Sequence, residues 1–300
     1  MSMLSRRHFL QTGLAASAAA MTTPFAKRLA HAAAPGAGMR FGLVTYLWGK
    51  DWALPTLIAN CEQTQVLGVE LRTEHAHGVQ PSLSSQERAE VKKRFEDSPV
   101  EVLGPGTNEC YDSPDPAKLQ QCIENTKAFI KLSHDIGGSG VKVKPNDFHP
   151  GVPREKTIEQ IGQSLNNVGR FAADYGQQIR LEVHGKCCEL PTIKAIMDIA
   201  THPSVGVCWN SNDQDLRGGG LEHNFNLVKD RFGDTVHVRE LNIGEYPYQE
   251  LMNLFVAMDY RGWILLEART APKDRVKALV EQREVWETLI ETAQTRVATR

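Results

Sequence analysis

Eight short runs rich in β-branched and other apolar residues recur along the chain, and each is followed by a loop and a segment with helical periodicity. This alternation favours parallel strand pairing, because a parallel neighbour needs a crossover connection, which a helix usually supplies. Eight such units within residues 33–300 predict a single-domain α/β fold, a parallel eight-stranded (β/α)8 barrel. The predicted strands are residues 40–46, 68–72, 100–104, 140–144, 179–184, 205–209, 235–240 and 263–267.

The first 32 residues have the order of an export signal. A twin arginine, Arg6-Arg7, precedes an apolar run of small residues at 12–20 and the sequence Ala30-His31-Ala32. This order is typical of a Tat-type signal peptide with a small-x-small cleavage site. The alternatives are an N-terminal helix or a membrane span, but a span needs roughly 20 strongly apolar residues. We therefore expect residues 1–32 to be a Tat signal and the protein to be exported, to the periplasm or another extracytoplasmic location.

Charge limits the partners of the mature chain. The predicted signal holds four basic residues and no acidic ones, so its removal lowers the formal net charge from −2 to −6. A mildly acidic body without a basic stripe is a poor partner for a polyphosphate, which argues against nucleic acid. No other segment is apolar for long enough to cross a bilayer, so we expect no stable membrane insertion after cleavage. The sequence leaves open whether the protein forms an oligomer.

Four predicted strands end in residues that can bind a metal. Glu182, Asn210, His237 and Glu267 follow one another at 28, 27 and 30 residues, about one β/α unit each. Because the loops after barrel strands build one shared mouth, this spacing would bring the four together. Oxygen donors with one imidazole suit a divalent ion such as Mn²⁺, Mg²⁺ or Zn²⁺. The alternative is four ordinary solvated strand ends.

Five segments of the chain are characteristic: GVELR at 68–72, LEVHG at 181–185, VGVCWNSND at 205–213, HVREL at 237–241 and LLEAR at 265–269. They resemble the xylose isomerase-like TIM barrel superfamily, which includes the sugar phosphate isomerase/epimerase family. The resemblance implies that Glu182 and Glu267 bind metal and exchange the substrate proton as the catalytic pair, with His237 as the imidazole ligand.

The sixth strand departs from the family pattern. Relatives often have Asp-Thr-Gly-His there, whereas this chain has Asn210-Ser211-Asn212-Asp213. Asn210 thus stands in place of a carboxylate ligand, and Asp213 in place of a histidine. A neutral amide oxygen can still bind a cation, but the ion would then be a stronger Lewis acid and be held more weakly.

Further polar and aromatic residues near the strand ends are candidate substrate contacts. His184 lies on the same face of its strand as Glu182. Lys142 and Lys144 alternate on the fourth strand and could stabilise a developing oxyanion; the alternative is that their side chains extend to solvent at the rim of the barrel. For Arg239 and Arg269 the alternative role is an ion pair with a glutamate, and for Trp48 it is packing in the core. The predicted contacts are His184, Lys142, Lys144, Arg239, Arg269, Asp213, Trp48 and His75.

The resemblance predicts a metal-dependent sugar isomerase or epimerase that moves a proton through a metal-stabilised enediolate, with a small carbohydrate as substrate. Two other functions remain open. One is a lyase or hydratase that acts on an oxidised sugar, and the other is a non-catalytic sugar-binding relative. The state of the vicinal pair Cys187-Cys188, two thiols or a disulfide, is also open.

Overall fold

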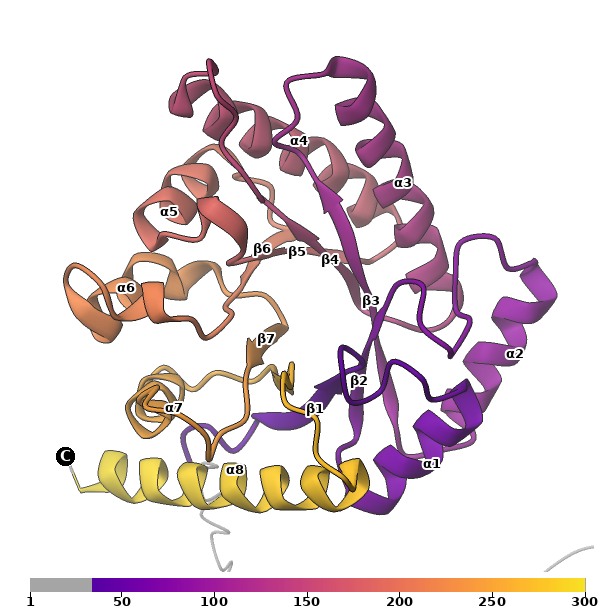
Figure 1. Ribbon diagram of the computed structural model, residues 1–300, viewed down its shortest axis with the longest axis vertical. Helices are drawn as coiled ribbons and strands as arrows, with labels where there is room; N and C mark the ends of the chain where they lie inside the picture. Colours follow the sequence, from indigo (N-terminus) through magenta and orange to yellow (C-terminus); the bar gives the residue numbers. More distant parts are fainter. Residues whose placement is uncertain (1–33, 300) are drawn as a thin grey trace, which may run out of the picture. The chain divides into compact units, whose positions relative to one another are not determined.

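A computed structural model describes residues 34–299, and these form a nearly closed barrel of eight parallel strands surrounded by eight helices (Figure 1). The predicted fold class is confirmed. The predicted signal peptide lies outside the described residues. Along the sheet the strand order is β6-β5-β4-β3-β2-β1-β8-β7, so strands that follow one another in sequence are paired, except β6 and β7, and β1 pairs with β8. The strands are β1 (Arg40–Val44), β2 (Gly68–Arg72), β3 (Glu101–Cys110), β4 (Gly140–Lys144), β5 (Gln178–Glu182), β6 (Val205–Cys208), β7 (Thr235–Val238) and β8 (Trp263–Leu266).

The helices cover the outside of the strands, and capping residues mark where some of them begin. Asp115 caps α3, because its carboxylate accepts a hydrogen bond from the Ala117 N–H at 2.9 Å, and Pro116 is the first helical residue. No described helix combines the length and the apolar character that crossing a bilayer requires. The helices are α1 (Leu54–Thr64), α2 (Ser85–Glu96), α3 (Pro116–Asp135), α4 (Arg154–Asp174), α5 (Leu190–Ile199), α6 (Gly220–Val228), α7 (Tyr248–Ala257) and α8 (Arg275–Ala298).

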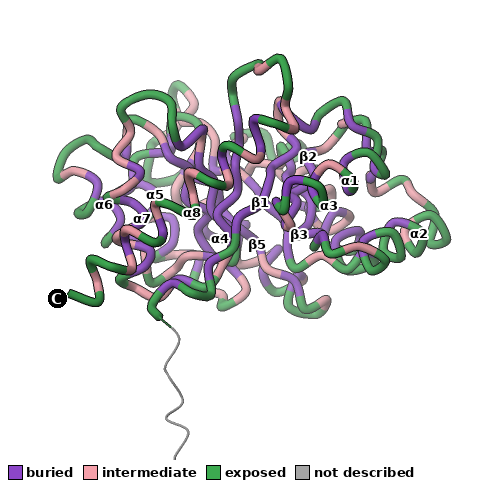
Figure 2. The backbone as a smooth tube through the Cα atoms, turned by 90° about the horizontal axis from the view of Figure 1, so that it is seen from below, coloured by how far each residue is buried: buried purple, intermediate pink, exposed green. Residues whose placement is uncertain are grey.

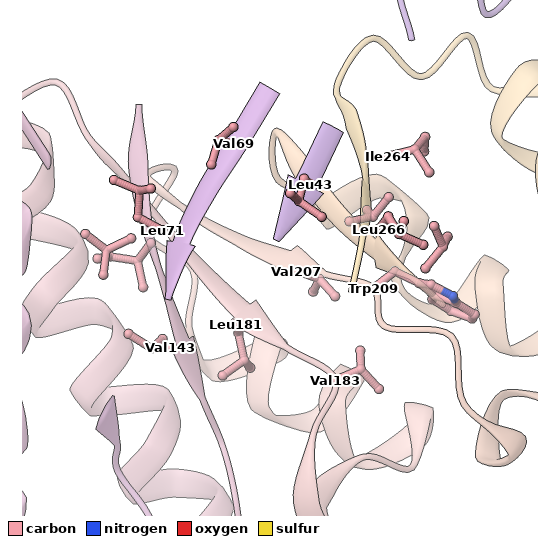
Figure 3. Packing of buried hydrophobic residues seen from close by; sticks show 14 of the residues in the cluster. Leu43, Val69, Leu71, Val143, Leu181, Val183, Val207, Trp209, Ile264 and Leu266 are labelled. Carbon is pink, nitrogen blue, oxygen red and sulfur yellow. The ribbon is translucent and has the colours of Figure 1, made fainter. Parts of the chain in front are cut away.

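Successive residues of each strand alternate between the helices and the barrel interior. The outward residues are apolar and belong to the main hydrophobic core, among them Leu43, Val69 and Leu181, which are labelled in Figure 3. Buried residues accordingly concentrate along the strands, while the outer helices and the loops carry the exposed ones (Figure 2). Burial of the outward residues removes apolar surface from water at roughly 25 cal/mol per Å², which stabilises the barrel. Because the outward residues supply this apolar burial, the inward positions can carry polar side chains.

Strand β3 is longer than predicted. The apolar pattern predicts a strand that ends at Gly104, before Pro105, but the strand continues to Cys110 across shifts in its register with β2 and β4. Gly104 has φ +121°, and a Cβ there would lie 1.8 Å from the Gly140 carbonyl oxygen. The glycine therefore permits an irregular strand instead of ending it.

The barrel closes between β6 and β7 at the predicted ligands. These two strands share only isolated bridges, one of which joins Asn210 to His237. The His237 N–H donates to the Trp209 carbonyl at 2.6 Å, and the Ser211 N–H donates to the His237 carbonyl at 3.1 Å. This backbone pairing holds Asn210 and His237 side by side.

Candidate metal centre and active site

Four side chains that the sequence singled out meet at the C-terminal mouth of the barrel. Glu182, His237 and Glu267 each offer one ligand atom within 4.8 Å of the others, and all three side chains are buried. The Asn210 amide lies between the glutamates, and its Nδ2 donates to Glu182 Oε1 at 2.7 Å and to Glu267 Oε2 at 3.3 Å. Strand register explains the convergence, because all four positions face inward on neighbouring strands.

A fifth buried group, Glu70 on β2, completes this centre and was missed by the sequence analysis. Glu70 Oε2 lies 3.2 Å from His237 Nε2, and both side chains are almost fully buried. An ionised carboxylate can only accept, so the imidazole donates its Nε2–H and turns Nδ1 toward Glu182 Oε1, 3.9 Å away. The sequence feature that could have identified Glu70 is an acidic residue at an inward position of the otherwise apolar strand GVELR.

The charges in this centre stabilise one another. Burial by itself would raise the pKa of the Glu70 carboxyl, but His237 and Lys142 outweigh it and hold that pKa below its ordinary value. Burial also disfavours the imidazolium form of His237, yet Cys208 and Glu70 raise the pKa of His237 well above its ordinary value. Proton release from His237 would therefore accompany any binding of a cation at Nδ1.

Lys142 is fully buried beneath Glu182. Its Nζ lies 2.6 Å from Glu182 Oε2 and donates to the Thr107 carbonyl at 3.1 Å. Burial would raise the pKa of Glu182, but Lys142 and then His237 hold this pKa well below its ordinary range. Lys142 thus lies inside the centre, not at the rim.

Three further side chains face the barrel interior two residues nearer the mouth, on β2, on β4 and just after β5. They are Arg72, Lys144 and His184. Arg72 is buried, and its guanidinium donates to the Gly106 and Thr107 carbonyls. Burial, with Lys142 and Arg72, lowers the pKa of Lys144 to about 8. Burial also lowers the pKa of His184 to about 4, with Lys144 contributing, although Glu182 opposes the shift. Arg72 was not among the predicted contacts.

The other two predicted basic contacts lie farther out. Arg239 is half-buried, and its guanidinium donates to Asn212 Oδ1. Arg269 is exposed, and its backbone N–H donates to Glu240 Oε1 at 2.9 Å. Within the described residues, neither arginine forms the ion pair with a glutamate that was weighed as an alternative.

The aromatic and histidine contacts expected from the first strands have other partners. Trp48 is 2% exposed and packs in the hydrophobic core, with its Nε1–H bonded to the Thr270 carbonyl at 3.0 Å. His75 is partly buried, with Nδ1 3.1 Å from Thr45 Oγ1. Trp209 also faces outward into the core, where it packs against Phe225. Packing in the hydrophobic core, and not a contact at the mouth of the barrel, fixes both tryptophan side chains.

A comparison with known families agrees with this geometry. The profile of the xylose isomerase-like TIM barrel family matches residues 58–289. The chain belongs to the xylose isomerase-like TIM barrel family. Among curated protein sequences, none is significantly similar to it.

Several solved structures have the same fold as this chain. An L-ribulose 3-epimerase superimposes with a TM-score of 0.75 at 16% identity, covering 87% of this chain and 97% of the other. The 3-keto-D-glucoside 4-epimerase YcjR from E. coli has a TM-score of 0.71 at 13% identity, covering 83% and 99%. The IolI protein, solved with a bound zinc atom, has a TM-score of 0.71 at 13% identity, covering 85% and 99%. At these identities, the likeness concerns the fold.

The loop after β6 in this xylose isomerase-like barrel differs from the expectation for its acidic residues. Asp213, the predicted substrate contact, is exposed, whereas Asp215 is fully buried. Asp215 Oδ2 accepts hydrogen bonds from the Asn212 N–H at 2.8 Å and from the Tyr246 hydroxyl at 2.7 Å. The side chain of Asn212 in turn donates to the Asn210 carbonyl at 2.8 Å. Asp215 therefore shapes the loop that leads away from Asn210.

Proposed function

We propose that this protein is a divalent-metal-dependent sugar isomerase or epimerase whose substrate binds at the C-terminal mouth of the barrel. The observation that carries the proposal is the convergence of Glu182, His237 and Glu267, with the Asn210 amide between the glutamates. The sugar epimerases among the structures of the same fold support the substrate class.

The donor set fits a divalent ion. His237 Nδ1 and Asn210 Oδ1 are buried without a hydrogen-bond partner, which is costly for polar atoms that have no ligand to bind. One imidazole nitrogen, one amide oxygen and two carboxylates are ligands that Mn²⁺, Mg²⁺ and Zn²⁺ accept. We therefore expect Glu182, Asn210, His237 and Glu267 to hold the ion.

The residues of the centre divide the work of proton transfer. A divalent ion bound there would stabilise negative charge on a substrate oxygen, which lowers the cost of removing a proton from the adjacent carbon. Glu182 and Glu267 lie on either side of the Asn210 amide, so two carboxylates face one space. One carboxylate removes the proton and the other returns one, to the same carbon in an epimerase or to its neighbour in an isomerase. Lys142 keeps Glu182 ionised and fixed in position.

Deuterium exchange tests this function directly. The protein, purified without a tag, is analysed for bound metal and incubated in D₂O with a panel of aldoses, ketoses and keto-sugars. We expect about one divalent ion per chain and deuterium at the carbon beside the carbonyl group. Glu182→Gln and Glu267→Gln should each lower the exchange rate by about 10²- to 10⁴-fold. Glu189→Gln, at an exposed glutamate before α5, is the control.

NMR analysis of the products in the same reactions separates the alternatives. An isomer or epimer keeps the mass of the substrate, whereas a product that has lost water assigns the protein as a lyase. The catalytic proposal is overturned if the panel binds without exchange or turnover and if both glutamine variants bind sugar as the parent protein does. A non-catalytic sugar-binding protein would then be the better description.

We also propose that the protein is exported through the Tat route and that the domain boundary follows residue 32. The proposal rests on the twin arginine and the small-x-small sequence. Replacing both Arg6 and Arg7 by lysine should keep the protein in the cytoplasm with its leader attached, as fractionation and intact mass would show. Export of that variant at the normal rate would contradict it.

A further inference from the structure

Two cationic side chains beside the metal centre share one neutral acceptor. Lys144 Nζ donates to Asn108 Oδ1 at 3.0 Å, and Arg72 donates to the same oxygen at 2.9 Å. No carboxylate among residues 34–299 forms an ion pair with either side chain. Arg72 is 8% exposed and its Nε–H has no partner. A cation as buried as Arg72 normally has an anionic partner, because desolvation of an unpaired charge is costly, whereas Lys144 is half-buried.

These cations lie next to the proposed metal centre. Arg72 and Lys142 donate to the same Thr107 carbonyl oxygen, each at 3.1 Å, and Lys142 reaches Glu182 at 2.6 Å. Only Lys142 of the three cationic side chains has a carboxylate partner within the described chain. His184, one inward step beyond Glu182, has a buried Nδ1 without a partner. The unpaired donors therefore gather on the β2–β5 side of the mouth.

The charge balance points the same way. Glu70, Glu182 and Glu267 are matched in number by Lys142, Arg72 and Lys144, and a divalent ion would leave this centre two charges positive. A neutral sugar would not offset that excess, whereas an anionic substrate would. The lowered pKa of Lys144, about 8, reflects burial and the neighbouring cations Lys142 and Arg72, with Glu182 and Glu267 opposing.

We infer that Arg72 and Lys144, with His184 beside them, form an anion subsite, and that the substrate is a sugar acid whose carboxylate binds there. This inference rests on the proposed function only in placing the substrate at the Glu182–Glu267 centre. The two Lys144 protons not used by Asn108 are the donors available to the carboxylate, and the buried Arg72 guanidinium adds its positive charge. Arg72 and Lys144 thereby become specificity-determining residues.

Binding of matched ligand pairs tests the inference. Aldonic acids of four to six carbons are compared by calorimetry with the alditols of the same chain length, on the metal-loaded protein. We expect the acids to bind at least about tenfold more tightly, with an advantage that falls as salt rises. Lys144→Gln should remove about tenfold of the affinity for the acid and leave alditol affinity unchanged, and Lys144→Arg should restore it in part. Lys186→Gln, at an exposed lysine after β5, is the control.

Several outcomes would overturn the inference. Acids that bind no better than alditols, or that do not bind, contradict it. An acid preference that persists in Lys144→Gln means that the metal holds the carboxylate. Tighter binding of an alditol phosphate through Lys144 would assign the subsite to sugar phosphates instead. Metal content is measured in every variant, and a normal content with no acid preference rejects the subsite while leaving the metal centre intact.

Discussion

His237 on β7 donates its Nε2–H to Glu70 on β2 across the barrel interior, at 3.2 Å and over 167 residues of sequence. This contact selects the imidazole tautomer that leaves Nδ1 free to bind a cation beside Glu182. Glu70 is thus a positioning residue, because it acts on the ligand and does not touch the proposed ion.

The first prediction concerns this pair. Glu70→Gln should weaken metal affinity about 10- to 100-fold, since the neutral amide no longer enforces one tautomer or strengthens the imidazole as a ligand. Calorimetric titration with Mn²⁺ and Zn²⁺ measures the loss. The absorption spectrum of the Co²⁺-loaded variant should shift as well, which a purely structural role for Glu70 would not produce. An unchanged affinity and spectrum would remove Glu70 from the centre.

The second prediction concerns Asn210. In the structure its amide N–H groups donate to both glutamates, and hydrogen bonds to charged groups contribute about 1.5–3 kcal/mol each. Asn210→Asp places a third carboxylate there instead. With both hydrogen bonds lost, we expect the free energy of unfolding of the variant in EDTA to be about 3–6 kcal/mol lower than that of the parent protein. The variant should nevertheless bind a divalent ion more tightly. Denaturant unfolding with and without Mn²⁺ measures both effects, and equal stability in EDTA would refute this role.

The third prediction concerns the buried ion pair. Lys142→Met leaves Glu182 buried without its partner, which should lower the free energy of unfolding by about 3–5 kcal/mol. The control is Lys194→Met, which breaks the exposed Lys194–Asp198 pair and should cost less than about 1 kcal/mol. If urea unfolding shows equal losses of unfolding free energy for the two variants, the buried Lys142–Glu182 pair stabilises the fold no more than an exposed ion pair does.

The fourth prediction concerns pH. Burial raises the pKa of Asp215 from 3.8 to about 7; Asp213 adds to the rise, while the Asn212 N–H, Tyr246 and Arg239 oppose it. The folded state then holds a proton that the unfolded chain has lost, so the contribution of Asp215 to stability is full below pH 3.8. It falls as pH rises toward 7, by up to about 1.4 kcal/mol per pH unit.

Asp215→Asn isolates this effect, because the amide mimics the protonated acid. The difference in unfolding free energy between the parent protein and the variant should shift in favour of the variant from pH 5 to pH 8. Parallel curves for the two proteins over that range would show that Asp215 is already ionised in the fold.

Much of the fold follows from local patterns. The eight apolar runs depend on neighbours a few residues away, and the barrel that they predict is the one observed. The predictable part of the site was its spacing: ligand candidates one β/α unit apart lie on adjacent strands. The extent of β3 was not predictable, because Gly104 looks like a strand end until the approach of Gly140 is known.

By itself, the sequence determined which strands exist, which face of each is apolar, and that Glu182, Asn210, His237 and Glu267 share one mouth. Only the tertiary structure decided which other groups join them. Glu70 and Arg72 come from β2, far away in sequence, and their contacts, like the contact of Lys142 with Glu182, arise from barrel closure and register. Such contacts leave no local periodicity, because the free energy that buries a charge depends on partners that only the closed barrel supplies.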